Sequence, residues 1–266
     1  MNLRLVFLSS CLLLLLSSSH LTAQSIFPLI GKPDTDRKIL FGVEYGLGIG
    51  QIKLTELNTR LKALQIGRLD ETLFNAQVAI TFERPDGFGS YLEGAWGVSL
   101  ENQSFAENSR LGFSTSSFEV GYQFPIIYSN HLGTWFTAGF QTNRLHFRYD
   151  YNTTAEVDFD QTLTNPAANF NALSLVSSSN YLASLGLKSQ YRFRSKEKNS
   201  PIECRLGFNS EYNLAFKKPS WLEDGGMKAV KNIPAVNPGN FNINLTFSIL
   251  YTSDIFKPRS ERSQNR

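Results

Sequence analysis

The chain has 266 residues, a formal net charge of +3 at pH 7, 18% charged residues and 13% aromatic residues. So small a net charge gives no indication of nucleic-acid binding, and we expect no nucleic-acid partner. Of the two cysteines, Cys11 falls in the leader described next. Cys204 is then alone, which excludes a disulfide framework and a cysteine-based zinc site.

The first residues have the composition of a targeting segment. Arg4 precedes an apolar run at 5–16, and small residues follow it, which predicts a secretory signal peptide of residues 1–23. A lipoprotein signal ending at Cys11 is the alternative, but five leucines follow that cysteine, so cleavage there would cut the apolar run. Residues 24–37 contain two prolines and predict an extended lead-in.

The rest of the chain alternates apolar and polar residues, a period that predicts strands with one apolar face. We predict eight strands, at residues 39–51, 73–84, 91–101, 117–124, 134–149, 181–193, 202–216 and 241–251. The clearest is the last, at 241–251. Its roughly eleven residues, at about 3.3 Å each and tilted near 45°, span about 25 Å, the height of the apolar band of a membrane barrel.

Two stretches depart from this alternation. In the fifth strand the apolar phase changes between Phe140 and Leu145, which predicts a bulge or strand end at 141–144. Leucines at helical spacing over 54–64 predict a short amphipathic helix with Thr55 as N-cap. This helix either packs on the mouth of a barrel or recruits a partner.

Three features favour a membrane barrel over a soluble sandwich or a lipocalin-like lipid carrier. Long and short connections alternate, as in outer-membrane barrels. Aromatic residues near the strand ends predict two interfacial girdles. The girdle at the short turns comprises Phe82, Tyr91, Phe124, Trp135, Phe136, Tyr191, Phe193 and Tyr251; the opposite one comprises Phe74, Phe118, Tyr212, Phe216 and Phe241. The third feature is that the face opposite the apolar one carries charges.

These charged residues are expected in one cluster across the lumen. They are Glu44, Glu93, Glu119, Lys188 and Arg205. Buried charges are tolerated when they are paired, so we interpret the cluster as a structural network, with a proton or ion path as the alternative.

In its signal peptide, strand number, girdles and loop alternation, the chain resembles the small OmpA/OmpX-type outer-membrane barrels of Gram-negative bacteria. The resemblance implies an all-β fold, an eight-stranded antiparallel up-and-down transmembrane β-barrel over residues 38–256. It also implies a monomer in the cell outer membrane. A basic tail at 257–266 departs from the pattern, since many such barrels end on an aromatic residue.

The interior of an eight-stranded barrel holds side chains or one small ligand, so a filled lumen is expected. The long loops then predict a structural or surface-interaction role, with a protein partner at the surface. Arg144, His146 and Arg148 are candidate outer-rim contacts to anionic lipopolysaccharide, or solvated loop charges.

The alternative function is a lipid-modifying enzyme, which needs a histidine and a serine near the outer rim. His146 is the candidate, since His131 lies in a short turn at the other end, but no spacing specifies a dyad. We therefore predict no catalytic residue and no cofactor. The acidic loop with Asp150, Glu156, Asp158 and Asp160 lacks the glycine spacing of a calcium loop, so no metal is expected.

Overall fold

The computed structural model describes residues 39–129, 131–151, 172–193, 201–223 and 229–253. The predicted signal peptide (1–23), lead-in (24–37) and tail (257–266) lie outside the described residues, as does most of the acidic loop after Asp150.

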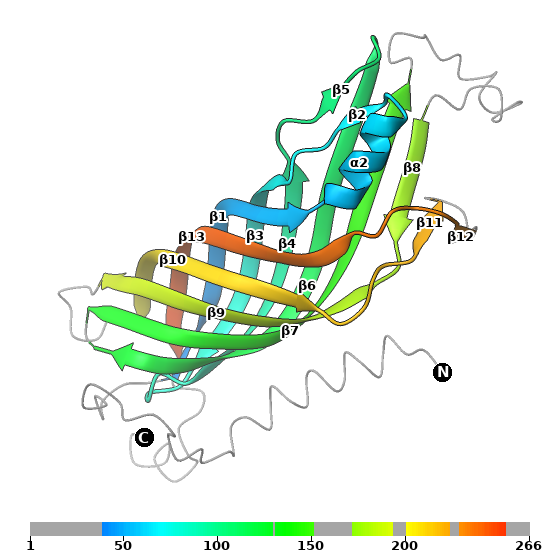
Figure 1. Cartoon of the computed structure of the whole chain (residues 1–266). Coiled ribbons are helices and arrows are strands. Elements are labelled where there is room, and N and C mark those ends of the chain that lie inside the picture. Colours follow the sequence, from blue (N-terminus) through cyan, green and yellow to red (C-terminus); the bar gives the residue numbers. More distant parts are fainter. Residues whose placement is uncertain (1–38, 130, 152–171, 194–200, 224–228, 254–266) are drawn as a thin grey trace, which may run out of the picture.

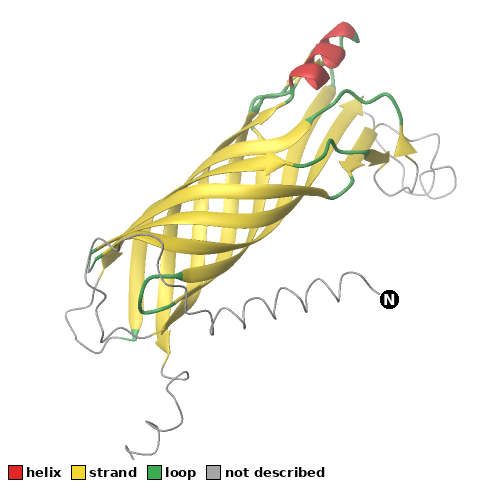
Figure 2. Ribbon diagram, turned by 60° about the horizontal axis from the view of Figure 1, so that its bottom comes forward, coloured by secondary structure: helices red, strands yellow, loops and turns green. Residues whose placement is uncertain are grey.

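Eight long strands form an antiparallel ring in which each strand pairs with its neighbours along the chain, and the last closes on the first. They are β1 (Ile39–Lys53), β3 (Thr72–Glu83), β4 (Gly89–Ser99), β6 (Ser109–Tyr128), β7 (Leu132–Tyr151), β9 (Asn180–Phe193), β10 (Ile202–Ala215) and β13 (Asn237–Ser253). Figure 2 shows these strands inclined around a common axis. The prediction of an eight-stranded up-and-down barrel is confirmed.

Short elements collect at the end of the barrel where the connections are long (Figure 1). They are α2 (Thr55–Ala63), β2 (Gly67–Arg68), β5 (Gln103–Ser104), β8 (Ala172–Ser177), β11 (Trp221–Glu223) and β12 (Ala229–Val230). β8, β11 and β12 continue the sheet outward from β7, while β2 pairs with β5. We call these short elements, with the adjoining ends of β6 and β7, the outer platform.

The helix in the first long loop is confirmed, but its predicted N-cap is wrong. Leu54 occupies the N-cap position, and no side chain caps the helix. The Leu54 N–H instead donates to Glu71 Oε1 at 3.1 Å, and the Thr55 hydroxyl donates to the same oxygen at 3.3 Å. No helix in the described residues is long and apolar enough to cross a membrane.

The outer wall of the ring is apolar and open to the surroundings. Leu47, Phe208 and Leu245, on three adjacent strands, are 57%, 53% and 63% exposed. The residues that alternate with them point inward and are mostly polar residues or glycines. A soluble carrier needs the reverse arrangement, so the lipocalin-like alternative is wrong.

β6 and β7 are longer than predicted, and the bulge predicted at 141–144 is absent. The two strands pair without interruption from Ser109↔Tyr151 to Pro125↔Trp135, and their one irregularity lies between Pro125 and Ile127. Gln141, Asn143, Leu145 and Phe147 all keep the inward phase and are buried. The apolar residues change sides because the interior changes from polar to apolar, while the strand itself runs straight on.

This apolar interior is a compact core at the long-loop end, which we call the mouth core. It comprises Ile52, Leu54, Leu57, Leu61, Leu69, Leu73, Leu111, Phe113, Leu145, Phe147, Leu175, Trp221 and Val236. Leu57 and Leu61 are the buried apolar residues of α2, so the helix packs on the barrel mouth. The outer platform thus has an apolar core of its own, inside the end of the ring.

Candidate functional site: the closed lumen

The short-turn end of the lumen contains a compact set of ion pairs, which we call the rim cluster: Glu83, Arg192, Glu203 and Arg205. Arg205 Nη1 lies 2.7 Å from Glu83 Oε2, and Arg192 Nη2 lies 2.9 Å from Glu83 Oε1. Both arginines also approach Glu203 Oε1, Arg205 at 2.6 Å and Arg192 at 3.5 Å. Two carboxylates therefore balance two guanidinium groups, as buried charges require.

Two aromatic side chains complete this closure. The Arg192 guanidinium lies 4.0 Å from the centroid of the Tyr128 ring, and the Arg205 guanidinium lies 5.4 Å from the Trp135 ring. The Trp135 indole N–H donates to the Gly87 carbonyl at 2.8 Å, so the ring is tied to the first short turn. Tyr128 also donates its hydroxyl to Glu83. Trp135 is fully buried in this packing.

The predicted girdle at the short turns therefore needs a correction. Trp135 and Tyr91 are buried lumen residues, whereas Tyr191, Phe193 and Tyr251 are about half exposed on the outer wall. Tyr91 shares the inward phase of Glu93 two residues later, and Trp135 shares that of Thr137. The alternation itself could have identified both, since residues two apart on a strand face the same way.

Nearer the middle of the lumen, Glu44 has a dense set of partners. Lys188 Nζ lies 2.6 Å from Glu44 Oε2, which also accepts hydrogen bonds from Gln190 and Ser248 at 2.7 Å each. These groups come from β1, β9 and β13, so the contact ties strands across the lumen.

Three further carboxyl groups, from Glu93, Glu119 and Glu211, lie around the same level. Glu93 and Glu119 are directly paired on β4 and β6, and Glu93 lies within electrostatic range of Glu211. Glu119 accepts hydrogen bonds from Tyr91 and Ser184, each at 2.5 Å, and Glu211 accepts one from Asn213 at 2.7 Å. In the described part of the chain, Glu119 and Glu211 are thus held by neutral hydrogen-bond donors, and no ion pair joins either of them to a base.

The five lumen charges named from the sequence thus lie in two sets. Arg205 belongs to the rim cluster, while Glu44, Glu93, Glu119 and Lys188 lie farther in. Glu83, Arg192 and Glu211 also have the inward phase of their strands, but they were not predicted as members of the cluster. Their partners come from strands far apart in sequence, which a pattern along one strand cannot show.

The candidate outer-rim residues lie together on the outer face of β7, in the platform. Arg144 and Arg148 are exposed. Arg144 Nε donates to the Ser179 hydroxyl at 3.4 Å, and Arg148 Nε lies 2.7 Å from Asp150 Oδ1. His146 faces Ser114 of β6 in the pairing register, but within the described residues no hydrogen bond joins its imidazole to a hydroxyl.

A closed ring with an apolar exterior and a polar, charged interior defines the class of the protein. In a bilayer every backbone polar group must find a partner within the protein, and a ring without free edges satisfies this. The protein is a transmembrane β-barrel of the type found in bacterial outer membranes.

Comparison with solved structures finds barrels of this same class. A major outer membrane protein from Thermus thermophilus is 12% identical, with a TM-score of 0.46, over 80% of this chain and 98% of that one. Neisserial surface protein A is 8% identical (TM-score 0.43; 81% and 97%), and Ail of Yersinia pestis is 12% identical (0.39; 80% and 99%). No protein-family model and no curated protein sequence matches the chain.

Proposed function

We propose that the protein is a non-enzymatic outer-membrane barrel with a closed lumen, whose outer platform presents a folded surface to a protein partner. The observation that supports this proposal is that buried side chains occupy both ends of the lumen. The rim cluster with Trp135 fills the short-turn end, and the mouth core fills the other.

A closed lumen leaves the outer platform as the part that can act on the surroundings. The mouth core packs its helix against its strands, so the platform holds a defined shape beyond the membrane-spanning part of the barrel. Its outer surface carries charged residues such as Arg60, Arg68 and Arg144, all exposed. Rigid, charged surfaces suit specific recognition because little conformational entropy is lost on binding.

The geometry at His146 gives no support to a lipid-modifying enzyme. The imidazole lies on an exposed strand face, and Arg148 beside it is paired with Asp150. Arg144, His146 and Arg148 remain, in this proposal, surface residues that contact anionic groups of the outer leaflet or of the partner.

A photo-crosslinking amino acid placed at Arg60 of α2, and in a separate sample at Leu245 of the outer wall, tests the surface role in intact cells. We expect the probe at Arg60 to give a discrete protein adduct. The probe at Leu245 is the control, because that side chain faces lipid and should give no such adduct. No protein adduct from Arg60, or the same adducts from both positions, would contradict the proposal.

A further inference from the structure

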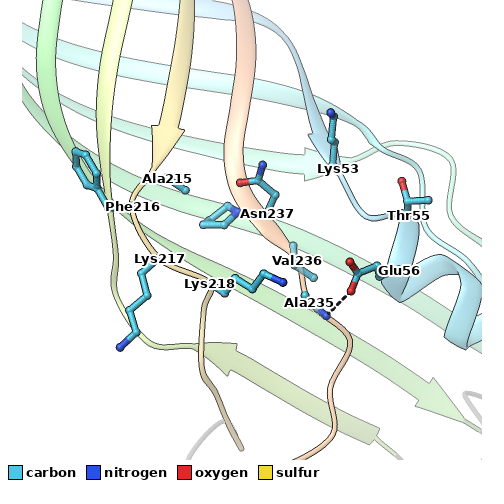
Figure 3. A pocket seen from close by; sticks show the side chains of 11 residues that line it. Lys53, Thr55, Glu56, Ala215, Phe216, Lys217, Lys218, Ala235, Val236 and Asn237 are labelled. Atoms are coloured by element: carbon cyan, nitrogen blue, oxygen red, sulfur yellow. Dashed lines mark hydrogen bonds between the residues drawn. The ribbon is translucent and has the colours of Figure 1, made fainter.

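A pocket of about 420 Å³ lies on the outer wall where the barrel meets the outer platform. That volume falls in the range of roughly 300–1,000 Å³ that small-molecule sites occupy. The pocket lies between the end of β1, the end of β10 and the start of β13 (Figure 3). Its lining residues are Lys53, Thr55, Glu56, Ala215, Phe216, Lys217, Lys218, Ala235, Val236, Asn237 and Pro238.

The charge of the lining is positive. Three lysines and one glutamate leave a net charge of about +2 at neutral pH. Glu56 is held in the wall, because its Oε2 accepts the Ala235 N–H at 3.2 Å. Among the described residues no ion pair joins Lys53, Lys217 or Lys218 to a carboxylate. Three lysines against one glutamate in the lining favour an anion, and the side-chain amide of Asn237 adds a neutral hydrogen-bond donor.

The surroundings of the pocket indicate where this anion comes from. Phe216 lines the pocket and is 67% exposed, and below it on the outer wall Tyr212 and Phe241 are 52% and 41% exposed. Exposed aromatic rings at this end of the apolar wall mark the level of lipid head groups. Lys53 has the same outward phase as Phe41 and Ile49, so this lining residue lies on the bilayer side of the wall.

We propose that this pocket binds a phosphate-bearing head group of an outer-leaflet lipid. Lys53, Lys217 and Lys218 supply the positive charge that attracts the phosphate, while Phe216 contacts the apolar part of the same molecule. Buried Val236 of the mouth core forms part of the wall, so the bound lipid rests on the platform's own core. This site is separate from Arg144, His146 and Arg148 on β7, and it does not depend on a protein partner.

Native mass spectrometry of the purified full-length barrel in detergent tests the site, with diphosphorylated lipid A, dephosphorylated lipid A and inorganic phosphate as probes. The test variant is Lys53→Gln/Lys217→Gln/Lys218→Gln. The matched control, Lys62→Gln/Arg110→Gln/Lys231→Gln, removes three positive charges from exposed positions at the same end outside the pocket. The gel shift between unheated and boiled samples verifies that each variant is folded.

We expect the test variant to lose about tenfold in affinity for diphosphorylated lipid A, since each partly exposed charge contact contributes a modest increment. The control variant should bind as the wild type does, and removal of the lipid's phosphates should abolish the difference between variants. Two results would overturn the proposal. One is equal lipid A binding by the test and control variants. The other is wild-type affinity for inorganic phosphate as high as for lipid A, which would make the pocket a site for free phosphate.

Discussion

Glu83 is the residue on which the short-turn closure depends. Its two carboxylate oxygens receive three hydrogen bonds at 2.7–2.9 Å from Arg192 and Arg205, which come from two other strands. All three side chains are at most 2% exposed. Removing the one acid would leave two buried guanidinium groups to be balanced by Glu203, which is itself more exposed at 16%.

We therefore expect Glu83→Gln to destabilise the barrel by about 3–5 kcal/mol, the usual effect of breaking a buried ion pair. Urea unfolding in phospholipid vesicles, followed by the heat-dependent gel shift, measures this. Arg148→Gln is the control, because its ion pair with Asp150 is exposed and should contribute at most about 1 kcal/mol. Equal effects from both substitutions would show that the rim cluster does not stabilise the barrel.

β7 is the element that joins the two environments. Below, its inward residues Thr137 and Gln141 face a polar lumen; above, Leu145 and Phe147 face the mouth core. Its outward residues change from apolar to charged in the same direction, with aromatic rings on the membrane-facing wall and charged residues in the platform. One uninterrupted strand thus crosses the boundary between a bilayer and water, where the favoured location of apolar side chains reverses.

Leu145→Ala should destabilise the outer platform by about 2–5 kcal/mol, since this fully buried leucine would leave a cavity in the mouth core. The barrel below should persist, because its wall is held by strand pairing and lipid contact. Protease digestion of reconstituted vesicles checks this, with faster cleavage of the platform expected and the gel shift retained. Arg144→Ala, the adjacent but exposed position, should leave cleavage unchanged, and cleavage of both variants at the wild-type rate would contradict the assignment.

The alternation along each strand was sufficient to predict the eight strands of the ring, and the helical spacing of leucines over 54–64 predicted the helix at 55–63. The alternation failed at 141–144 because a change of environment and a bulge give the same pattern in sequence. The alternation also did not predict the first half of β6, since the polar composition of 109–116 is typical of a loop. Gly112, Ser114 and Ser116 occupy the outward face of this strand, in the part that extends beyond the bilayer. The alternation could not predict the rim cluster, because the four members of this cluster meet only when the ring closes.

For the molecule as a whole, the rim cluster with Trp135 and the mouth core lie one after the other along the same lumen. We expect the reconstituted barrel to give no ion-conducting steps in planar lipid bilayers. Trp135→Ala, which opens only the short-turn end, should stay insulating because the mouth core still fills the other end. Conducting steps from the wild type would contradict the closed lumen, and steps from Trp135→Ala would show that the mouth core does not seal it.

The mouth core also has a consequence for the order of assembly. Ile52 lies near the end of the first strand and Leu54 directly follows that strand, while Val236 directly precedes the last. β1 and β13 form the seam that closes the ring. Contacts between residues so distant in sequence form late, because the chain must first close a long loop. The platform's core can therefore be completed only when the seam closes, so an unsealed barrel would expose an unfinished apolar surface. Burial of that apolar surface on closure of the seam would then couple insertion of the barrel to folding of the platform.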